Sequence, residues 1–229
     1  MQSPESGLEL DGPRHDPESG EPAVGLIVLL HGLGADGNDL ISLAPMLAPV
    51  LPGVAFVSPH APFPCDMAPM GRQWFSLQDY SDEAILVGVQ KVAPILNAFL
   101  DAELAKRGLQ ENQMALLGFS QGTMTALHVA LRRPRPCAAV IGFSGALVKP
   151  ALLADELVSR PPVTLIHGEA DPVVPFPALP AAEAALKAKG VPVSVLARPG
   201  LQHGIDQEGL EFAVLALHRH LVAGNGGPA

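Results

Sequence analysis

The chain has 229 residues, of which 48% are apolar and 16% are charged, so it has the composition of a folded protein and enough length for a large core. Its formal net charge of −9 argues against nucleic acid and anionic membrane surfaces as general partners. Two cysteines, Cys65 and Cys137, are too few for a disulfide framework, and no secretory signal is recognisable near Met1, so a cytoplasmic location is expected. The purely apolar runs are only a few residues long, which predicts no integral membrane association.

The N-terminal part differs in composition from the rest of the chain. Residues 1–22 are rich in Pro, Glu, Gly and Ser and are expected to form a partly mobile extension with an edge strand at Leu8–Leu10. Residues 23–223 are predicted to form a single domain, and residues 224–229 a flexible tail.

The first half of the domain contains two continuous apolar runs, Val24–Leu30 and Val54–Val57. Such runs predict strands buried on both faces. A helix is expected between them, from Asn38 or Asp39 to Leu47. Residues 60–80 form a long loop that is rich in proline and in large apolar side chains, and loops of this length are commonly functional. A helix from about Ser81 to Lys106 follows, which Pro94 should kink or split.

The second half of the domain alternates strands with helices. This alternation predicts the α/β class, with a mostly parallel central sheet, flanking helices, right-handed crossovers and no separate cap domain. The expected strands are Met114–Leu117, Cys137–Phe143, Val163–Gly168 and Val193–Leu196, and the expected helices are Thr123–Arg132, Ala181–Lys189 and Glu208–Leu221.

The pentapeptide Gly118-Phe119-Ser120-Gln121-Gly122 has the pattern G-x-S-x-G. It lies between an apolar strand and a helix, which is the context of a nucleophile elbow. The glycines two residues to either side would relieve the crowding around a strained serine. Ser120 would then lie at a helix N-terminus, whose dipole favours developing negative charge.

A nucleophilic serine needs a base, and the base needs a group to orient it. Asp171 and His203 follow Ser120 in the order Ser, acid, His, and each comes just after a predicted strand. Carboxyl ends of parallel strands are where sites on open α/β sheets form. We therefore expect Ser120 to attack, His203 to transfer the proton and Asp171 to hold the imidazole. Glu169 is the alternative acid, and Ser144 is interpreted as structural or as a cleft wall.

An acyl-transfer site also needs donors for the oxyanion. The expected donors are the backbone N–H of Gln121 and one N–H from His31-Gly32-Leu33-Gly34, with Leu33 as the candidate. The sequence contains no HExxH, no Cys/His pair spacing, no P-loop and no GxGxxG, so neither a metal nor a cofactor is expected.

These motifs together resemble those of the phospholipase/carboxylesterase family, which includes acyl-protein thioesterases and small bacterial carboxylesterases. The matching pieces are Leu30–Gly34 with Asp36-Gly37, Pro59–Pro62, Trp74-Phe75, Gly118–Gly122, His167-Gly168 with Asp171–Pro175, and His203. The resemblance implies an α/β-hydrolase fold without a cap. It implies Ser120, Asp171 and His203 as the triad and Leu33 and Gln121 at the oxyanion hole. It also implies substrate contacts at Phe63, Trp74, Val173 and Val174.

The function expected from the resemblance is a serine carboxylesterase that hydrolyses short- to medium-chain esters of small molecules without a cofactor. The segment Cys65–Gly71 is more similar to bacterial members than to eukaryotic thioesterases. A lysophospholipase or an acyl-protein thioesterase is the alternative within the enzyme class. A non-catalytic binding protein on a hydrolase fold is the alternative outside it. The resemblance also allows a homodimer.

Overall fold

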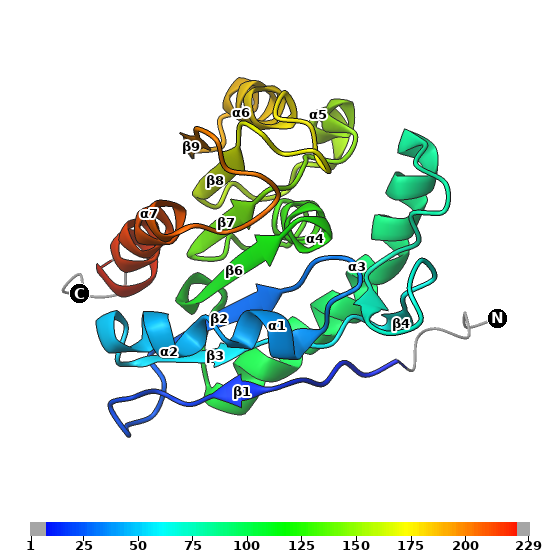
Figure 1. Ribbon diagram of the computed structural model, residues 1–229. Helices are drawn as coiled ribbons and strands as arrows, with labels where there is room; N and C mark the ends of the chain where they lie inside the picture. Colours follow the sequence, from blue (N-terminus) through cyan, green and yellow to red (C-terminus); the bar gives the residue numbers. More distant parts are fainter. Residues whose placement is uncertain (1–7, 224–229) are drawn as a thin grey trace.

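The computed structural model describes residues 8–223 and contains a seven-stranded sheet in the order β1-β3-β2-β6-β7-β8-β9 (Figure 1). Neighbouring strands are parallel except for β1, which is antiparallel to β3. A separate two-stranded hairpin, β4 with β5, lies in the long loop. The strands are β1 (Arg14–His15), β2 (Gly25–Leu30), β3 (Val54–Val57), β4 (Phe63–Pro64), β5 (Arg72–Gln73), β6 (Met114–Phe119), β7 (Ala139–Phe143), β8 (Val163–Gly168) and β9 (Val193–Arg198).

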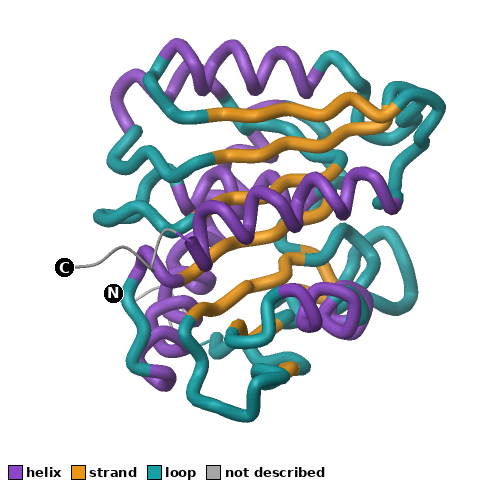
Figure 2. The backbone as a smooth tube through the Cα atoms, turned by 90° about the vertical axis from the view of Figure 1, so that its left-hand side faces the viewer, coloured by secondary structure: helices purple, strands orange, loops and turns teal. Residues whose placement is uncertain are grey.

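Helices cover both faces of this sheet, so the predicted α/β fold, with a mostly parallel central sheet and flanking helices, is confirmed (Figures 1 and 2). Apolar side chains of α3, α4 and α6 pack on one face, and those of α1, α2 and α7 pack on the other. The helices are α1 (Gly37–Ile41), α2 (Ala44–Leu47), α3 (Asp82–Arg107), α4 (Gln121–Ala130), α5 (Leu153–Glu156), α6 (Ala178–Ala188) and α7 (Gln207–Leu217). Short 3₁₀ turns lie at Ala48–Val50, Glu111–Gln113 and Pro150–Leu152, and a π-helical turn at His218–Val222.

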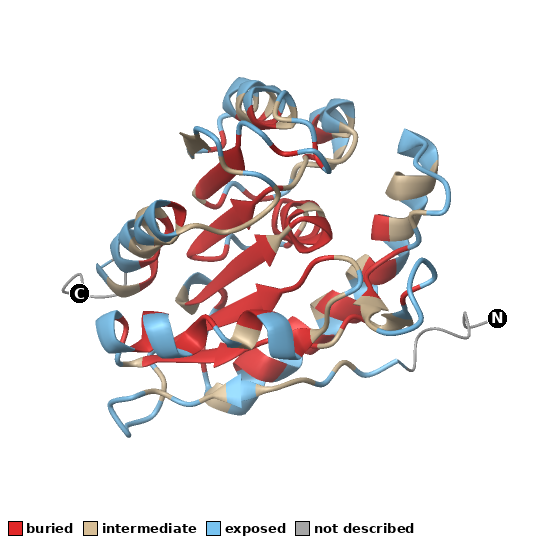
Figure 3. Cartoon of the chain, viewed as in Figure 1, coloured by how far each residue is buried: buried red, intermediate tan, exposed pale blue. Residues whose placement is uncertain are grey.

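The side chains of strand β2 pack on both faces of the sheet. Leu26, Val28 and Leu30 belong to one apolar cluster, while Ile27 and Leu29 belong to the other, and all five are fully buried. Successive strand side chains point to opposite faces, so a continuous apolar run is what a doubly covered strand requires. Each such side chain contributes about 1.5–3 kcal/mol through burial. Figure 3 shows the buried strands enclosed by helices whose outer faces are exposed.

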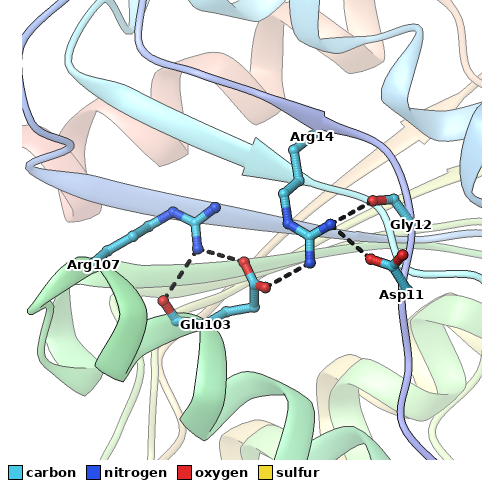
Figure 4. Close-up of polar contacts among 5 residues, drawn as sticks. All are labelled: Asp11, Gly12, Arg14, Glu103 and Arg107. Carbon is cyan, nitrogen blue, oxygen red and sulfur yellow. Dashed lines mark hydrogen bonds and ion pairs between the residues drawn. The ribbon is translucent and has the colours of Figure 1, made fainter.

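The N-terminal segment is placed differently from the prediction. Leu8–Leu10 is not a strand; the edge strand is β1, at Arg14–His15. The Arg14 guanidinium donates to the carboxylate of Glu103 on α3 at 2.8 Å, and Arg107 also pairs with that carboxylate (Figure 4). Burial raises the pKa of Glu103, but the two guanidinium groups outweigh burial and hold this pKa below its ordinary value. Residues 1–7 and the predicted tail lie outside the described residues.

Two helix predictions need correction. The helix expected from residue 38 or 39 to Leu47 is divided into α1 and α2. Pro45 has no N–H group, so it cannot donate the hydrogen bond that would continue α1. At the end of α1, the Ser42 hydroxyl donates to the Asp39 carbonyl oxygen. Conversely, α3 is not split at Pro94 but continues through it as one helix. Pro94 lies on the exposed side of α3, so the carbonyl that loses its helical donor can bind water.

Helix α3 also meets the length and composition test for a membrane span, with a mean hydropathy of 1.4 in its most apolar window. The sequence analysis predicted this helix, but the short apolar runs did not indicate that it would meet the membrane-span test. Its buried side chains, among them Val92, Leu96 and Leu100, pack against the sheet in the core. The core helix of a soluble protein passes the same test.

His128, on α4, gives the core a pH-dependent stability. Its side chain is 4% exposed and its Nδ1 lacks a hydrogen-bond partner among the described residues. Burial, with a smaller contribution from Arg132, lowers the pKa of His128 from 6.5 to about 4. The unfolded chain therefore binds a proton before the folded protein does, so stability is lost as the pH falls from about 6.5 toward 4. When the pH falls from 7 to 4.5, we expect the titration of His128 to lower the unfolding free energy by roughly 2–3 kcal/mol.

The measurement is urea unfolding at both pH values, compared with His128→Gln, which cannot titrate. The variant should lose less stability on acidification than the wild type. Equal losses in the two proteins would contradict a buried neutral His128.

Candidate active site

Ser120 lies on a sharp turn between β6 and α4, the context that the G-x-S-x-G motif predicts. Its backbone has φ 54° and ψ −117°, a strained conformation for a residue with a side chain. The flanking glycines are sterically required. A Cβ at Gly118 would lie 2.5 Å from the Thr123 nitrogen, and one at Gly122 would lie 1.9 Å from the Leu30 oxygen. The turn therefore brings the start of α4 directly against β2.

Asp171 and His203 meet at the carboxyl ends of β8 and β9. His203 Nδ1 is 2.7 Å from Asp171 Oδ2. Because a carboxylate only accepts, Nδ1 carries the proton, which leaves Nε2 as the proton acceptor in the neutral ring. The His203 ring also packs against Phe119, with centroids 4.9 Å apart. The geometry thus joins the predicted acid and base.

The Asp171 carboxyl is fully buried and fully hydrogen-bonded. Its Oδ1 accepts from the N–H groups of Val173 at 2.8 Å and Val174 at 2.9 Å. His167 Nε2 lies 3.3 Å from Oδ2 and 2.9 Å from the Val174 oxygen. Burial raises the pKa of Asp171, but the hydrogen bonds from His203, Val173 and Val174 outweigh burial and hold this pKa below its ordinary value. The group is therefore a carboxylate at neutral pH.

A cavity of about 870 Å³ contains Ser120 and His203 in its lining. In the described part of the chain, no hydrogen bond joins Ser120 Oγ to the imidazole; unliganded sites commonly tighten this pair only when substrate binds. The wall is mostly apolar. Its residues are Gly32, Leu33, Leu77, Tyr80, Ile85, Phe119, Ser120, Gln121, Met124, Ala146, Pro172, Val173, Val174, Pro175, Ala178 and His203.

Both residues predicted to supply oxyanion donors line this cavity. Gln121 is the first residue of α4, so its N–H has no acceptor within the helix. Across residues 8–223, neither this N–H nor that of Leu33 is used in a hydrogen bond to the protein. The Gly32 Cα lies behind the serine, since a Cβ there would be 3.5 Å from Ser120 Cβ. Leu33 and Gln121 therefore line the cavity that contains Ser120, and in the described residues the protein leaves both N–H groups unused.

Two of the four residues predicted to contact substrate line the cavity, and two do not. Val173 and Val174 line the cavity, with Val173 63% exposed. Trp74 does not line it: the side chain is fully buried in the core, and its Nε1 donates to the His31 oxygen at 2.9 Å. Phe63 lines a separate hollow beside α3, where Lys91 lies over its ring. Neither aromatic residue lines the cavity that contains Ser120.

Sequence reasoning missed several residues of the cavity wall. Met124 lies four residues after Ser120 on α4, so helical spacing could have identified it. Ile85 and Leu77 come from the start of α3 and the loop before it; no motif marks them. Glu169, the alternative acid, is exposed and takes no part in the Asp171–His203 contact. Ser144 is buried with φ 48° and does not line the cavity.

Comparison with known proteins gives matches along most of the chain. The family model described as Phospholipase/Carboxylesterase matches residues 17–221. Esterase YpfH of Escherichia coli (strain K12) is 30% identical over 194 residues, 85% of this chain and 82% of that protein. Acyl-protein thioesterase 1 of Kluyveromyces lactis is 29% identical over 168 residues, 68% of this chain and 73% of that protein. The crystal structure of esterase PE8 superposes with a TM-score of 0.90 at 41% identity, covering 93% of this chain and 100% of that one.

Proposed function

We propose that this chain, which belongs to the phospholipase/carboxylesterase family and is a carboxylic ester hydrolase, cleaves short- to medium-chain esters with Ser120 as its nucleophile. The observation that carries the proposal is the 2.7 Å contact between His203 and the buried Asp171 carboxylate, beside the cavity that Ser120 lines. The contact fixes the imidazole tautomer that can take a proton from serine.

The proposed first half-reaction forms an acyl-enzyme. Ser120 Oγ adds to the ester carbonyl carbon while its proton passes to His203 Nε2, and the carbonyl electron pair moves onto oxygen. The Leu33 and Gln121 N–H groups would stabilise that oxyanion, each by about 3 kcal/mol. The electron pair on the oxyanion then returns to re-form the carbonyl, the C–O bond to the leaving group breaks, and the departing alcohol oxygen takes the proton from Nε2.

The proposed second half-reaction uses water in place of the serine. Water adds to the acyl carbon and gives a proton to His203 Nε2. The bond to Ser120 Oγ then breaks, Oγ regains the proton and the carboxylic acid leaves. Asp171 remains ionised throughout and stabilises the imidazolium, in keeping with its lowered pKa. One chain supplies all of these groups, so a homodimer is compatible with the proposal but not needed for it.

The cavity lining supports uncharged substrates over anionic ones. None of the lining residues in the described part of the chain is lysine or arginine. A phosphate near the scissile bond would therefore lose water without gaining a cationic partner. The net charge of −9 would also repel an anionic leaving group. This favours a carboxylesterase over the lysophospholipase alternative, whereas a neutral thioester stays a candidate substrate.

The preference for short to medium chains rests on two other points. Relatives carry the names esterase and probable carboxylesterase, and the sequence of Cys65–Gly71 resembles bacterial members of the family. The cavity volume sets only an upper bound on chain length. A cytoplasmic location is proposed alongside, consistent with two free, buried cysteines.

The experiment that tests the function measures hydrolysis of p-nitrophenyl esters from acetate to palmitate. We expect a maximum of kcat/KM at short to medium chains. A rise toward palmitate would shift the proposal to long-chain substrates. A folded protein that cleaves none of these esters would favour the binding-protein alternative.

A thioester arm of the same experiment tests the charge argument. Butyryl-coenzyme A and butyryl-N-acetylcysteamine share the acyl group and the thioester bond, and only the first is anionic. We expect at least about a tenfold higher kcat/KM for the neutral substrate, with a smaller difference at high salt because screening weakens repulsion. Preference for the coenzyme A ester would contradict the charge argument.

A further inference from the structure

The segment Arg72–Phe75 contacts both backbone regions that carry the proposed oxyanion donors. On one side it pairs with the loop that contains Leu33. The Gly34 N–H donates to the Arg72 oxygen at 2.9 Å, and the Arg72 N–H donates to the Ala35 oxygen at 2.8 Å. Trp74 Nε1 adds a third bond, to the His31 oxygen at 2.9 Å. These bonds hold the residues on both sides of Leu33.

On the other side the same segment is held by the side chain of Gln121. The Trp74 N–H donates to Gln121 Oε1 at 2.8 Å, and Gln121 Nε2 donates to the Phe75 oxygen at 2.7 Å. The glutamine is 1% exposed. Buried polar groups are costly unless paired, and this amide is paired at both ends with backbone.

The hairpin turn that precedes Arg72 and the loop that contains Leu33 lie so close together at Gly71 that no side chain would fit there. Gly71 has φ +88°, and a Cβ there would lie 2.0 Å from the Gly34 oxygen. A conformation of that kind favours glycine. The hairpin therefore approaches the loop backbone to backbone, so a shift of one moves the other.

We propose that Gln121 and Trp74 are positioning residues that clamp the two halves of the oxyanion hole at a fixed separation. The inference rests on the proposed function, because it assigns a role to the donors of that reaction. Leu33 and Gln121 belong to loops after different strands, β2 and β6, and the segment Arg72–Phe75 bridges them by five hydrogen bonds. Oxyanion stabilisation depends on donors that are already oriented when charge develops.

The clamp gives a role to Trp74, which lies in the loop beside the site but does not line the cavity. Its backbone N–H binds one half and its indole N–H binds the other. Loss of either bond should let the Leu33 and Gln121 N–H groups move relative to each other. A displacement of about 1 Å can lower the rate of the chemical step about a hundredfold.

The test compares three variants. Gln121→Met keeps the length of the side chain but removes both of its hydrogen bonds. Trp74→Phe keeps an aromatic ring and the backbone bond but removes the indole donor. Ser76→Ala is the matched control, because it breaks a hydrogen bond to Asp66 in the same loop without touching either donor segment. Thermal unfolding of each protein shows which of them are folded.

On p-nitrophenyl butyrate we expect kcat to fall about 10- to 100-fold in Gln121→Met and several-fold in Trp74→Phe. KM should stay within about twofold, and Ser76→Ala should resemble the wild type. Activity of the wild type on this ester tests the proposed function separately, so failure of the clamp and failure of the function are distinguishable.

The decisive readout is inhibition by an alkyl trifluoromethyl ketone and by the matched methyl ketone. With the trifluoromethyl ketone, Ser120 Oγ would add to the activated carbonyl carbon, its proton would pass to His203, and the resulting oxyanion would need both N–H donors. The methyl ketone would occupy the same cavity, but Ser120 would add to its less reactive carbonyl carbon only to a small extent. A loss of affinity confined to the trifluoromethyl ketone supports the clamp. Equal losses for both ketones, or no loss in either folded variant, would overturn it.

Discussion

Replacing Ser120 by alanine should reduce kcat on p-nitrophenyl butyrate by at least about 10⁴-fold and leave the fold intact. The hydroxyl is the only group removed, and it supplies the attacking oxygen in the proposed mechanism. Losses of this size are typical when a member of such a triad is deleted, while the oxyanion hole and substrate binding retain a small residual rate.

The fold should survive because the backbone strain is already present. Alanine has the same Cβ as serine, so φ 54° costs both residues a similar amount. The Ser120 N–H still donates to the Phe143 oxygen at 2.8 Å. Unfolding in urea should therefore give a midpoint close to that of the wild type.

Ser144→Ala is the matched control for this experiment. Ser144 is also a serine with positive φ at the end of a neighbouring strand, and its side chain is buried outside the cavity. Within residues 8–223 its hydroxyl makes a single 3.4 Å contact, to the Gly204 oxygen, so activity should change by less than about tenfold. Substantial turnover by Ser120→Ala, measured with purified folded protein, would rule out the proposed mechanism.

Replacing Asp171 by asparagine should lower kcat by about 10³- to 10⁴-fold through the wrong histidine tautomer. The two backbone N–H groups on Oδ1 require an acceptor, so the amide oxygen should take that place. The amide NH₂ then faces His203 Nδ1, which can no longer donate to it. The imidazole proton moves to Nε2, where it blocks acceptance of the serine proton.

Glu169→Gln serves as the control for the acid. Glu169 is the other carboxylate of the same loop, and it is exposed. We expect its activity within about twofold of the wild type. If Glu169→Gln lost more activity than Asp171→Asn on the same ester, the assignment of the acid would be wrong.

Much of the fold could be predicted because buried parallel strands leave a continuous apolar signal. β2, β3, β6 and β8 were identifiable in this way. β1 was not, because two residues carry no periodicity and their partners, on β3 and at Glu103, lie far away in sequence. The effect of Pro94 depends on which side of α3 faces solvent, and local sequence does not reveal that.

The predicted site shows the same division. Asp171 and His203 could be paired from the sequence because each follows a strand, and parallel strands bring their ends together. Trp74 was misplaced, since the direction of its ring depends on a carbonyl of His31 that only the folded chain brings near. The Gln121 side chain was overlooked for a similar reason: its partners are backbone groups, which no motif encodes.

The path of the N-terminal segment has a consequence for self-association. An uncovered strand at the end of a sheet presents unpaired N–H and C=O groups to other molecules. Here residues 11–19 run beside β3 and the residues that flank it, with the Ser58 N–H bound to the Pro13 oxygen, the His60 N–H to the Asp11 oxygen and the Ser19 N–H to the Pro52 oxygen. A strand from a second copy finds this border already occupied. The border that remains is β1, which is only two residues long and therefore gives a strand from another molecule little to extend. Arg14 of β1 is bound to Glu103 on α3.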